Sequence, residues 1–164
     1  MVRTLKTIPV SYDPDIEWRV EEPNMSEDLA RAYETVMLAL VMWREARGEG
    51  RDGQRAVGHV VRNRAKAGWG SVVECIVKKN QFTSMSVPGD GQLTRWPSDE
   101  DATFRNTLYD AQRILDGSDG DLTGGALYYE NPEVATSAWF INNVRLNTAE
   151  HPSTATIGRH VFYA

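Results

Sequence analysis

A chain of 164 residues is long enough to form one domain with a substantial hydrophobic core, and no second domain is required. Its 18 Lys and Arg residues are outnumbered by 23 Asp and Glu residues, which gives a formal net charge of −5 and makes nucleic acid an unexpected partner. Cys75 is the single cysteine, so an intramolecular disulfide is excluded, and no apolar stretch approaches membrane-spanning length. We therefore expect one monomeric domain without membrane insertion.

Residues 1–25 are expected to form an extended arm ahead of a folded domain at residues 26–164. Pro9, Pro14 and Pro23 interrupt this region, which mixes acidic residues with isolated apolar ones. The first residues also lack the continuous apolar core of a secretory signal. The sequence therefore predicts a chain that begins in the cytoplasm.

The most hydrophobic segment predicts a helix that begins after Ser26 and ends at Glu45 or Ala46, before Gly48. Its apolar face is formed by Leu29, Tyr33, Val36, Met37, Leu40 and Val41. Glu45 lies four residues after Val41, at the edge of that face. Because burial favours the protonated form of a carboxyl group, a glutamic acid in this position can act as a general acid. The alternative is a surface Glu45 paired with a neighbouring arginine, and helical spacing alone leaves both interpretations open.

Two more helices are predicted before residue 80. Asp52 is expected to cap a helix over residues 53–66, and Ser71 with Glu74 matches a capping box that begins a short helix ending near Lys78. Cys75 lies within the apolar run of this short helix, so we expect a buried, unreactive thiol. Residues 80–97 read as a polar loop or small hairpin.

The second half of the chain predicts one more long helix and a small amount of strand. The helix begins in the acidic run after Ser98 and ends at Gly117. The aspartates at 116, 119 and 121 lack the spacing of a calcium loop, so we interpret this region as a turn. Residues 124–131 read as a short strand and turn, residues 142–153 as an exposed loop, and residues 157–163 as a final strand. We expect an α+β domain that is mainly α-helical, with a small sheet or hairpin from residues near 80–96 and 124–131.

Several stretches resemble the SleB-type cell-wall hydrolases, in the same order along the chain. They are residues 43–50 (WREARGEG), 53–64 (GQRAVGHVVRNR), 81–83 (QFT), 125–132 (GALYYENP), 138–140 (AWF) and 157–163 (IGRHVFY). The resemblance implies a lysozyme-like single domain that cleaves peptidoglycan, with Glu45 as its catalytic residue. It also implies that peptidoglycan is the partner and that no cofactor is used.

The resemblance further implies which residues bind the glycan. Residues expected to contact substrate are Gln81, Phe82, Thr83, Tyr129, Asn131, Trp139 and His160. Aromatic faces stack on sugar rings, and amides bridge hydroxyl and acetamido groups, which suits these residue types. Glu49 is a candidate second carboxylate, with a weaker case because it lies beyond Gly48 and can simply pair with an arginine.

Cleavage between N-acetylmuramic acid and N-acetylglucosamine is the expected reaction. The resemblance implies a lytic transglycosylase, in which Glu45 acts first as acid and then as base and a 1,6-anhydro ring forms. A hydrolysing muramidase acting on the same bond is the alternative. A cytoplasmic chain that attacks the wall in the periplasm must be released by another factor, which is typical of a phage endolysin or a virion-associated lysin.

Two other classes of enzyme act on the stem peptide. A thiol peptidase would pair Cys75 with His160, but an apolar helix keeps a thiol inert. A zinc amidase needs about three protein ligands, and the three histidines include no pair spaced i, i+4 along a helix. We therefore expect no metal site.

Overall fold

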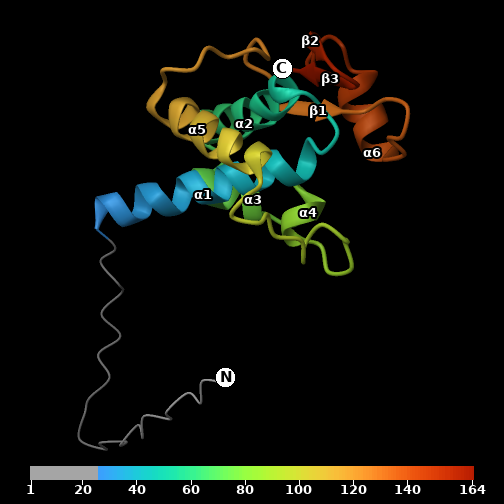
Figure 1. The fold of residues 1–164 in the computed structure, drawn as a ribbon. Helices are drawn as coiled ribbons and strands as arrows, with labels where there is room; N and C mark the ends of the chain where they lie inside the picture. Colours follow the sequence, from blue (N-terminus) through green and yellow to red (C-terminus); the bar gives the residue numbers. More distant parts are fainter. Residues whose placement is uncertain (1–25) are drawn as a thin grey trace, which may run out of the picture.

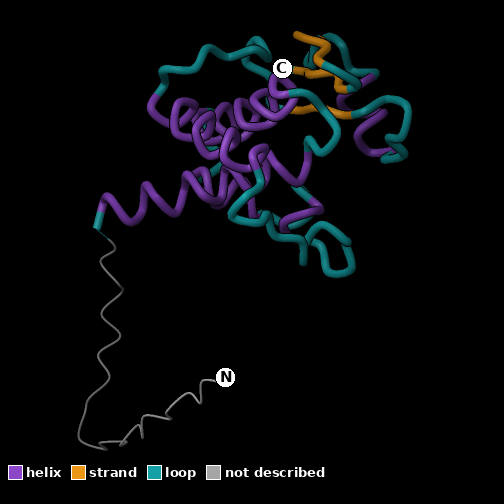
Figure 2. Tube along the Cα trace, viewed as in Figure 1, coloured by secondary structure: helices purple, strands orange, loops and turns teal. Residues whose placement is uncertain are grey.

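The computed structural model describes residues 26–164, and the arm expected at residues 1–25 lies outside them. The elements in chain order are α1 (Glu27–Glu45), α2 (Arg51–Lys66), α3 (Val72–Val77), α4 (Thr83–Ser86), α5 (Ala102–Asp116), β1 (Tyr128–Glu130), α6 (Ala138–Phe140), the π-helix η1 (Ile141–Arg145), β2 (Ser153–Ile157) and β3 (His160–Tyr163). Helices dominate, and the three strands gather at one end, beside the end of α1 (Figures 1 and 2). The predicted α+β, mainly helical class is confirmed.

Helix α1 is the central element, and only its second half is buried. The Ser26 side chain accepts a hydrogen bond from the Leu29 N–H and begins the helix, as predicted. All residues from Leu38 to Arg44 are buried, whereas Leu29 is 57% exposed. The apolar face predicted from the sequence is therefore buried only toward the end of the helix. The first turns of α1 extend beyond the helices that cover its second half (Figure 1).

Helices α2, α3 and α5 surround the second half of α1. The core residues of α2 are fully enclosed, and they are Ala56, Val57, Val60 and Val61. Helix α2 begins two residues earlier than predicted, with Gly50 at its N-cap, because Asp52 lies inside the first turn and pairs with Arg55 at 2.8 Å. The capping box predicted for Ser71 and Glu74 is present at the start of α3.

The aspartates after α5 form the predicted turn and hold it against α2. The buried Asp119 carboxylate accepts hydrogen bonds from Arg55, and it lies 3.0 Å from the His59 Nε2 atom. Asp121 accepts from the backbone N–H groups of Thr123 and Gly125, as aspartates in turns commonly do. Among residues 26–164, no cluster of three or more His, Cys, Asp or Glu side chains has the arrangement of a metal site.

The sheet is antiparallel, with the order β1-β3-β2, so the last strand in sequence is the central one. Tyr129 pairs with Phe162 across β1 and β3, and a bulge between Ser153 and Ala155 interrupts the β2 register. The final strand was predicted from residue 157, whereas a turn at Gly158 and Arg159 separates two strands there.

Residues 80–96 do not contribute to the sheet, which corrects the predicted hairpin. They form α4 and a series of turns. The Arg44 guanidinium donates hydrogen bonds to the backbone carbonyls of Ser84, Leu93 and Arg95. These carbonyls are therefore not available for strand pairing. Another predicted loop is also more ordered than expected, because η1 occupies the beginning of residues 142–153.

Candidate active site

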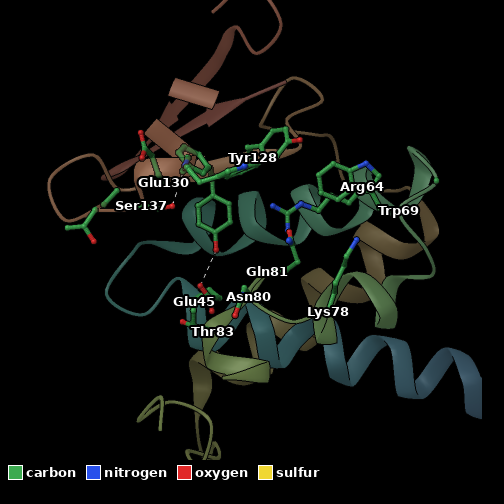
Figure 3. A pocket seen from close by; sticks show the side chains of 16 residues that line it. Glu45, Arg64, Trp69, Lys78, Asn80, Gln81, Thr83, Tyr128, Glu130 and Ser137 are labelled. Atoms are coloured by element: carbon green, nitrogen blue, oxygen red, sulfur yellow. Dashed lines mark hydrogen bonds between the residues drawn. The ribbon is translucent and has the colours of Figure 1, made fainter. Parts of the chain in front are cut away.

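A pocket of about 830 Å³ lies where the end of α1 meets the sheet (Figure 3). Its lining comes from α1, from α2 and the turn after it, from the segment between α3 and α4, from the start of α4, from β1, and from α6 with the segment before it. The lining residues are Glu45, Arg64, Gly68, Trp69, Lys78, Asn80, Gln81, Thr83, Tyr128, Tyr129, Glu130, Ala135, Thr136, Ser137, Trp139 and Phe140. Segments far apart in the sequence therefore build one cavity, which has the size range of a ligand site.

Glu45 is the last residue of α1, and its carboxyl group is held from both sides of the pocket. The Ser84 hydroxyl donates to Oε1 at 2.5 Å, and the Ser84 backbone N–H lies 3.3 Å from the same atom. The Tyr129 hydroxyl donates to Oε2 at 3.2 Å (Figure 3, dashed line). A hydroxyl group can either donate to a carboxylate or accept from a carboxylic acid, so these contacts suit a group that changes its protonation state.

Arg44 places Ser84 beside Glu45. This arginine is 5% exposed, and burial lowers its pKa, although the negative charge of Asp90 opposes the shift. It donates to the Ser84 carbonyl at 3.0 Å and to the Arg95 carbonyl at 2.8 Å. Because Arg44 and Glu45 are adjacent at the end of one helix, the arginine fixes the α4 segment and the carboxyl group together.

Tyr129 reaches Glu45 from β1 and is supported from behind by other aromatic rings. The His160 ring lies edge-on to it at 5.2 Å, and the Phe162 ring stacks on it at 5.7 Å. Burial raises the pKa of the Tyr129 phenol well above its ordinary value, and the charge of Glu45 raises it further. Tyr129 therefore stays protonated and keeps its hydrogen-bond donor.

The structure brings together four of the seven residues predicted to bind substrate. Gln81, Thr83, Tyr129 and Trp139 line the pocket with Glu45. Trp139 is 62% exposed, so one face of its indole remains open for a sugar ring.

The other three predicted contact residues do not line the pocket. Phe82 is 1% exposed because its ring belongs to the hydrophobic core. His160 is buried behind Tyr129, where burial lowers its pKa, the charge of Glu49 opposes that shift, and Arg159 adds to it. The Asn131 carboxamide oxygen accepts from the Glu133 N–H and organises a turn outside the lining. The structure therefore does not bring these three residues into the pocket, and Phe82 and His160 instead support residues that line it.

Glu49 lies away from the pocket and is part of an ion pair. Arg159 donates to the Glu49 Oε1 atom at 2.7 Å. Burial alone would raise the pKa of the Glu49 carboxyl group, but hydrogen bonds from the Arg159 side chain and backbone lower it below its ordinary value. A Cβ atom on Gly158, whose φ is +59°, would lie only 2.0 Å from Glu49 Oε2, so the turn requires glycine. The interpretation of Glu49 as a second carboxylate at the site is therefore not supported.

Several residues of the site were missed from the sequence: Ser84, which contacts Glu45, and the lining residues Arg64, Trp69 and Lys78. Ser84 follows the Gln81–Thr83 stretch directly, and Arg64 ends the stretch that begins at Gly53, so both were within reach of the resemblance. Trp69 and Lys78 lie in connections whose composition gives no signal of a pocket. Their location depends on how α2 and α3 pack.

Cys75 has the inert character expected from the sequence. It is 2% exposed, and burial raises its thiol pKa, although the positive charges of Arg64 and Lys78 oppose the shift. The thiol does not line the pocket that holds Glu45. A nucleophilic role for Cys75 therefore has no geometric support.

The family model described as cell wall hydrolase matches residues 48–163. The chain belongs to this family, and the predicted SleB-type resemblance is confirmed. The matched region begins just after Glu45, so the match itself says nothing of that residue.

Curated relatives are spore cortex-lytic enzymes. Those of Oceanobacillus iheyensis, Halalkalibacterium halodurans and Bacillus subtilis are 33%, 35% and 34% identical to this chain, each over 77% of it. The aligned part covers only 40%, 33% and 36% of those proteins, respectively. The chain therefore spans a third to two-fifths of the relatives it matches.

Two solved structures share the fold. The catalytic domain of the germination-specific lytic transglycosylase SleB from Bacillus anthracis superposes with a TM-score of 0.61 and 30% identity, covering 80% of this chain and 93% of that one. The catalytic domain of the Bacillus cereus SleB protein gives 0.58 and 31%, covering 80% and 89%. The lysozyme-like α+β architecture expected from the resemblance is thereby confirmed. Among the described helices, none has the length and apolar character to cross a membrane.

Proposed function

We propose that this protein is a lytic transglycosylase that cleaves the glycan strand of peptidoglycan, with Glu45 as general acid and then base. The similarity to a cell wall hydrolase family and to the catalytic domain of a lytic transglycosylase supports the substrate and the reaction. The roles of the residues rest on the geometry of the pocket.

The observation that carries the proposal is the contrast between the two carboxyl groups that line the pocket. Glu45 is contacted by the hydroxyls of Ser84 and Tyr129 and has no cationic partner among residues 26–164. Glu130 instead accepts hydrogen bonds from Arg145 and from the Tyr163 hydroxyl. An ion-paired carboxylate is a poor general base for water. One uncommitted carboxyl group fits a reaction in which the same residue serves both steps.

The proposed reaction balances without water. Glu45 donates its proton to the oxygen that leaves with N-acetylglucosamine as the bond from this oxygen to C1 of N-acetylmuramic acid breaks. The acetamido group of the muramoyl residue helps to carry the positive charge that develops at C1. The C6 hydroxyl then attacks C1, and the Glu45 carboxylate takes its proton, which closes the 1,6-anhydro ring and restores the acid.

Ser84 and Tyr129 have a clear part in this cycle. After the first step they donate hydrogen bonds to the new carboxylate, and such charge-assisted bonds are about twice as strong as neutral ones. They also fix the carboxyl group in one orientation, which is required because the same oxygen atoms must reach the leaving oxygen and then the C6 hydroxyl.

Mass spectrometry of the products from purified peptidoglycan tests the proposal. We expect muropeptides that end in 1,6-anhydromuramic acid, lighter by one water than the products of a muramidase. Products with reducing ends would assign hydrolysis instead. Free stem peptides from an uncut glycan strand would overturn both and return the assignment to an amidase or peptidase.

A further inference from the structure

Arg64 is an unusual lining residue because its charge is buried without a carboxylate partner. It is 5% exposed, and no Asp or Glu among residues 26–164 forms an ion pair with it. Burial lowers its pKa, a shift that the charges of Glu45 and other neighbours only oppose. Buried charges are normally paired, so an unpaired guanidinium beside a pocket requires an explanation.

The position of the Arg64 guanidinium is fixed by its surroundings. Its Nε donates to the Leu127 carbonyl at 2.7 Å. Its Cζ atom lies 5.3 Å from the centre of the Trp69 ring and 5.2 Å from that of Phe82. Nη1 is enclosed without a hydrogen-bond partner in the described chain, and Nη2 also makes none. Two donor nitrogens are therefore held in place and unused.

Arg44 shows what a satisfied buried arginine looks like in the same fold. It has a similar exposure and also lacks a carboxylate partner, but its three nitrogens donate to backbone carbonyls at 2.8 to 3.2 Å. Arg64 has one such bond. This difference separates a structural arginine from one with free donors.

A second cation shares this part of the pocket. Lys78 lines it, and Figure 3 shows its amine directed toward the side occupied by Arg64 and Trp69, with Gln81 nearby and Glu45 across the pocket. Arg64 and Lys78 define what we call the cationic end of the pocket.

We propose that the cationic end binds a carboxylate of the substrate while Glu45 acts on the neutral glycosidic bond. The inference rests on the proposed function and adds a determinant of specificity to it. A guanidinium packed on two aromatic rings keeps its N–H groups oriented, and an ammonium in the same pocket adds charge, which is the chemistry that recognises carboxylates. In peptidoglycan the carboxylate comes from the stem peptide or, where the peptide is absent, from the lactyl group of muramic acid.

The test measures binding and cleavage of peptidoglycan whose carboxylates have been coupled to methylamine. Retention of the Glu45→Gln protein on insoluble peptidoglycan reports binding without cleavage, and we expect it to weaken roughly tenfold after coupling. Net charge alone predicts stronger retention after coupling, because a protein of net charge −5 is repelled less by peptidoglycan whose carboxylates have been neutralised. Unchanged or stronger retention would overturn the inference.

Variants assign the effect to the cationic end. Adding Lys78→Met to the Glu45→Gln protein should weaken retention on native peptidoglycan severalfold. Coupling the carboxylates of peptidoglycan to methylamine should then weaken the retention of this variant less than it weakens that of the Glu45→Gln protein. Adding Lys79→Met is the matched control, because Lys79 is also exposed but does not line the pocket, and it should leave both measurements unchanged. Arg64→Gln should weaken retention more than Lys78→Met does, provided that the Arg64→Gln protein folds. If that protein does not fold, the Lys78→Met result decides the test. Equal effects of the two lysine variants would contradict the inference.

Peptidoglycan stripped of its stem peptides by an amidase distinguishes the two sources of carboxylate. Weaker retention on the stripped glycan would show that the bound carboxylate belongs to the stem peptide. Undiminished retention that is lost when the stripped glycan is coupled to methylamine would show that it belongs to the lactyl group. Failure of the proposed function would appear separately, as the absence of cleavage products from the unmodified protein on native peptidoglycan.

Discussion

Glu45 and Glu49 lie four residues apart, yet the fold gives them opposite surroundings. Glu45 ends α1 inside the pocket and is contacted by hydroxyl groups. Glu49 lies in the turn before α2 and is bound by Arg159, 110 residues away in sequence. A carboxylate neutralised by a guanidinium stabilises the fold, whereas one held by hydroxyls can still exchange a proton. The partner, more than the position in sequence, therefore decides which glutamate can do chemistry.

The largest expected effect comes from Glu45→Gln. The substitution keeps the shape of the side chain and removes the transferable proton, so cleavage should fall by about 10²–10⁴-fold. Release of muropeptides from purified peptidoglycan gives the rate, and circular dichroism checks the fold. Glu49→Gln is the matched control and should keep measurable activity. Near-normal cleavage by a folded Glu45→Gln protein would remove the distinction between the two glutamates.

Removing the hydroxyls around Glu45 should have an intermediate effect. Ser84→Ala and Tyr129→Phe each delete one hydrogen bond to the carboxyl group, and we expect each to lower kcat by about tenfold with little change in KM. The ratio of kcat to KM effects separates loss of orientation from loss of binding. An unchanged kcat in both variants would mean that the hydroxyls are only structural.

Glu49→Gln should act on stability. We expect a loss of about 1 kcal/mol in the free energy of unfolding at neutral pH, because the pair with Arg159 is partly exposed. The folded-state pKa of Glu49 is lowered, so its contribution is present above the unfolded-state value and is lost as the pH falls through the folded-state value. Urea titrations at pH 7 and pH 3.5 should show a smaller difference in stability between the variant and the unmodified protein at pH 3.5 than at pH 7. An equal difference at both values would contradict the ion-pair role.

The smallest expected effect concerns His160, which lies between the two regions. Its pKa is lowered by burial, so the folded protein resists protonation and loses stability as the pH falls below the unfolded value of about 6.5. His160→Gln should remove this loss between pH 7 and pH 5.5, as measured by thermal unfolding, while the loss due to Glu49 at lower pH persists. A pH dependence identical to that of the unmodified protein would show that another group titrates.

The sequence predicts those parts of the molecule that depend on local chemistry. The cap at Ser26, the capping box at Ser71 and the end of α5 at Gly117 follow from side chains acting within one turn of the helix, and all three are present. The hairpin predicted at residues 80–96 does not form, because Arg44, 40 residues before Ser84 in the sequence, donates hydrogen bonds to backbone carbonyls of this segment. No local pattern contains that contact.

The candidate site shows the same division. Glu45 was found because helical spacing placed it at the edge of the apolar face and the resemblance singled it out. Phe82 and His160 were assigned to the substrate because they lie in stretches that resemble the family, although burial makes them supports for Arg64 and Tyr129. A residue type fits both roles equally well, and only packing distinguishes them.

The strand order has a consequence for how the chain acquires its pocket during synthesis. Strand β3 follows all the other described elements, yet it is the strand on which both β1 and β2 pair. A ribosome delivers Glu45 early, while Tyr129 has no partner strand until residues 160–163 have left the exit tunnel. Contacts of such long sequence separation form late and slowly. We therefore expect the pocket to form only after β3 has been synthesised, when Tyr129 in β1 can contact Glu45 at the end of α1.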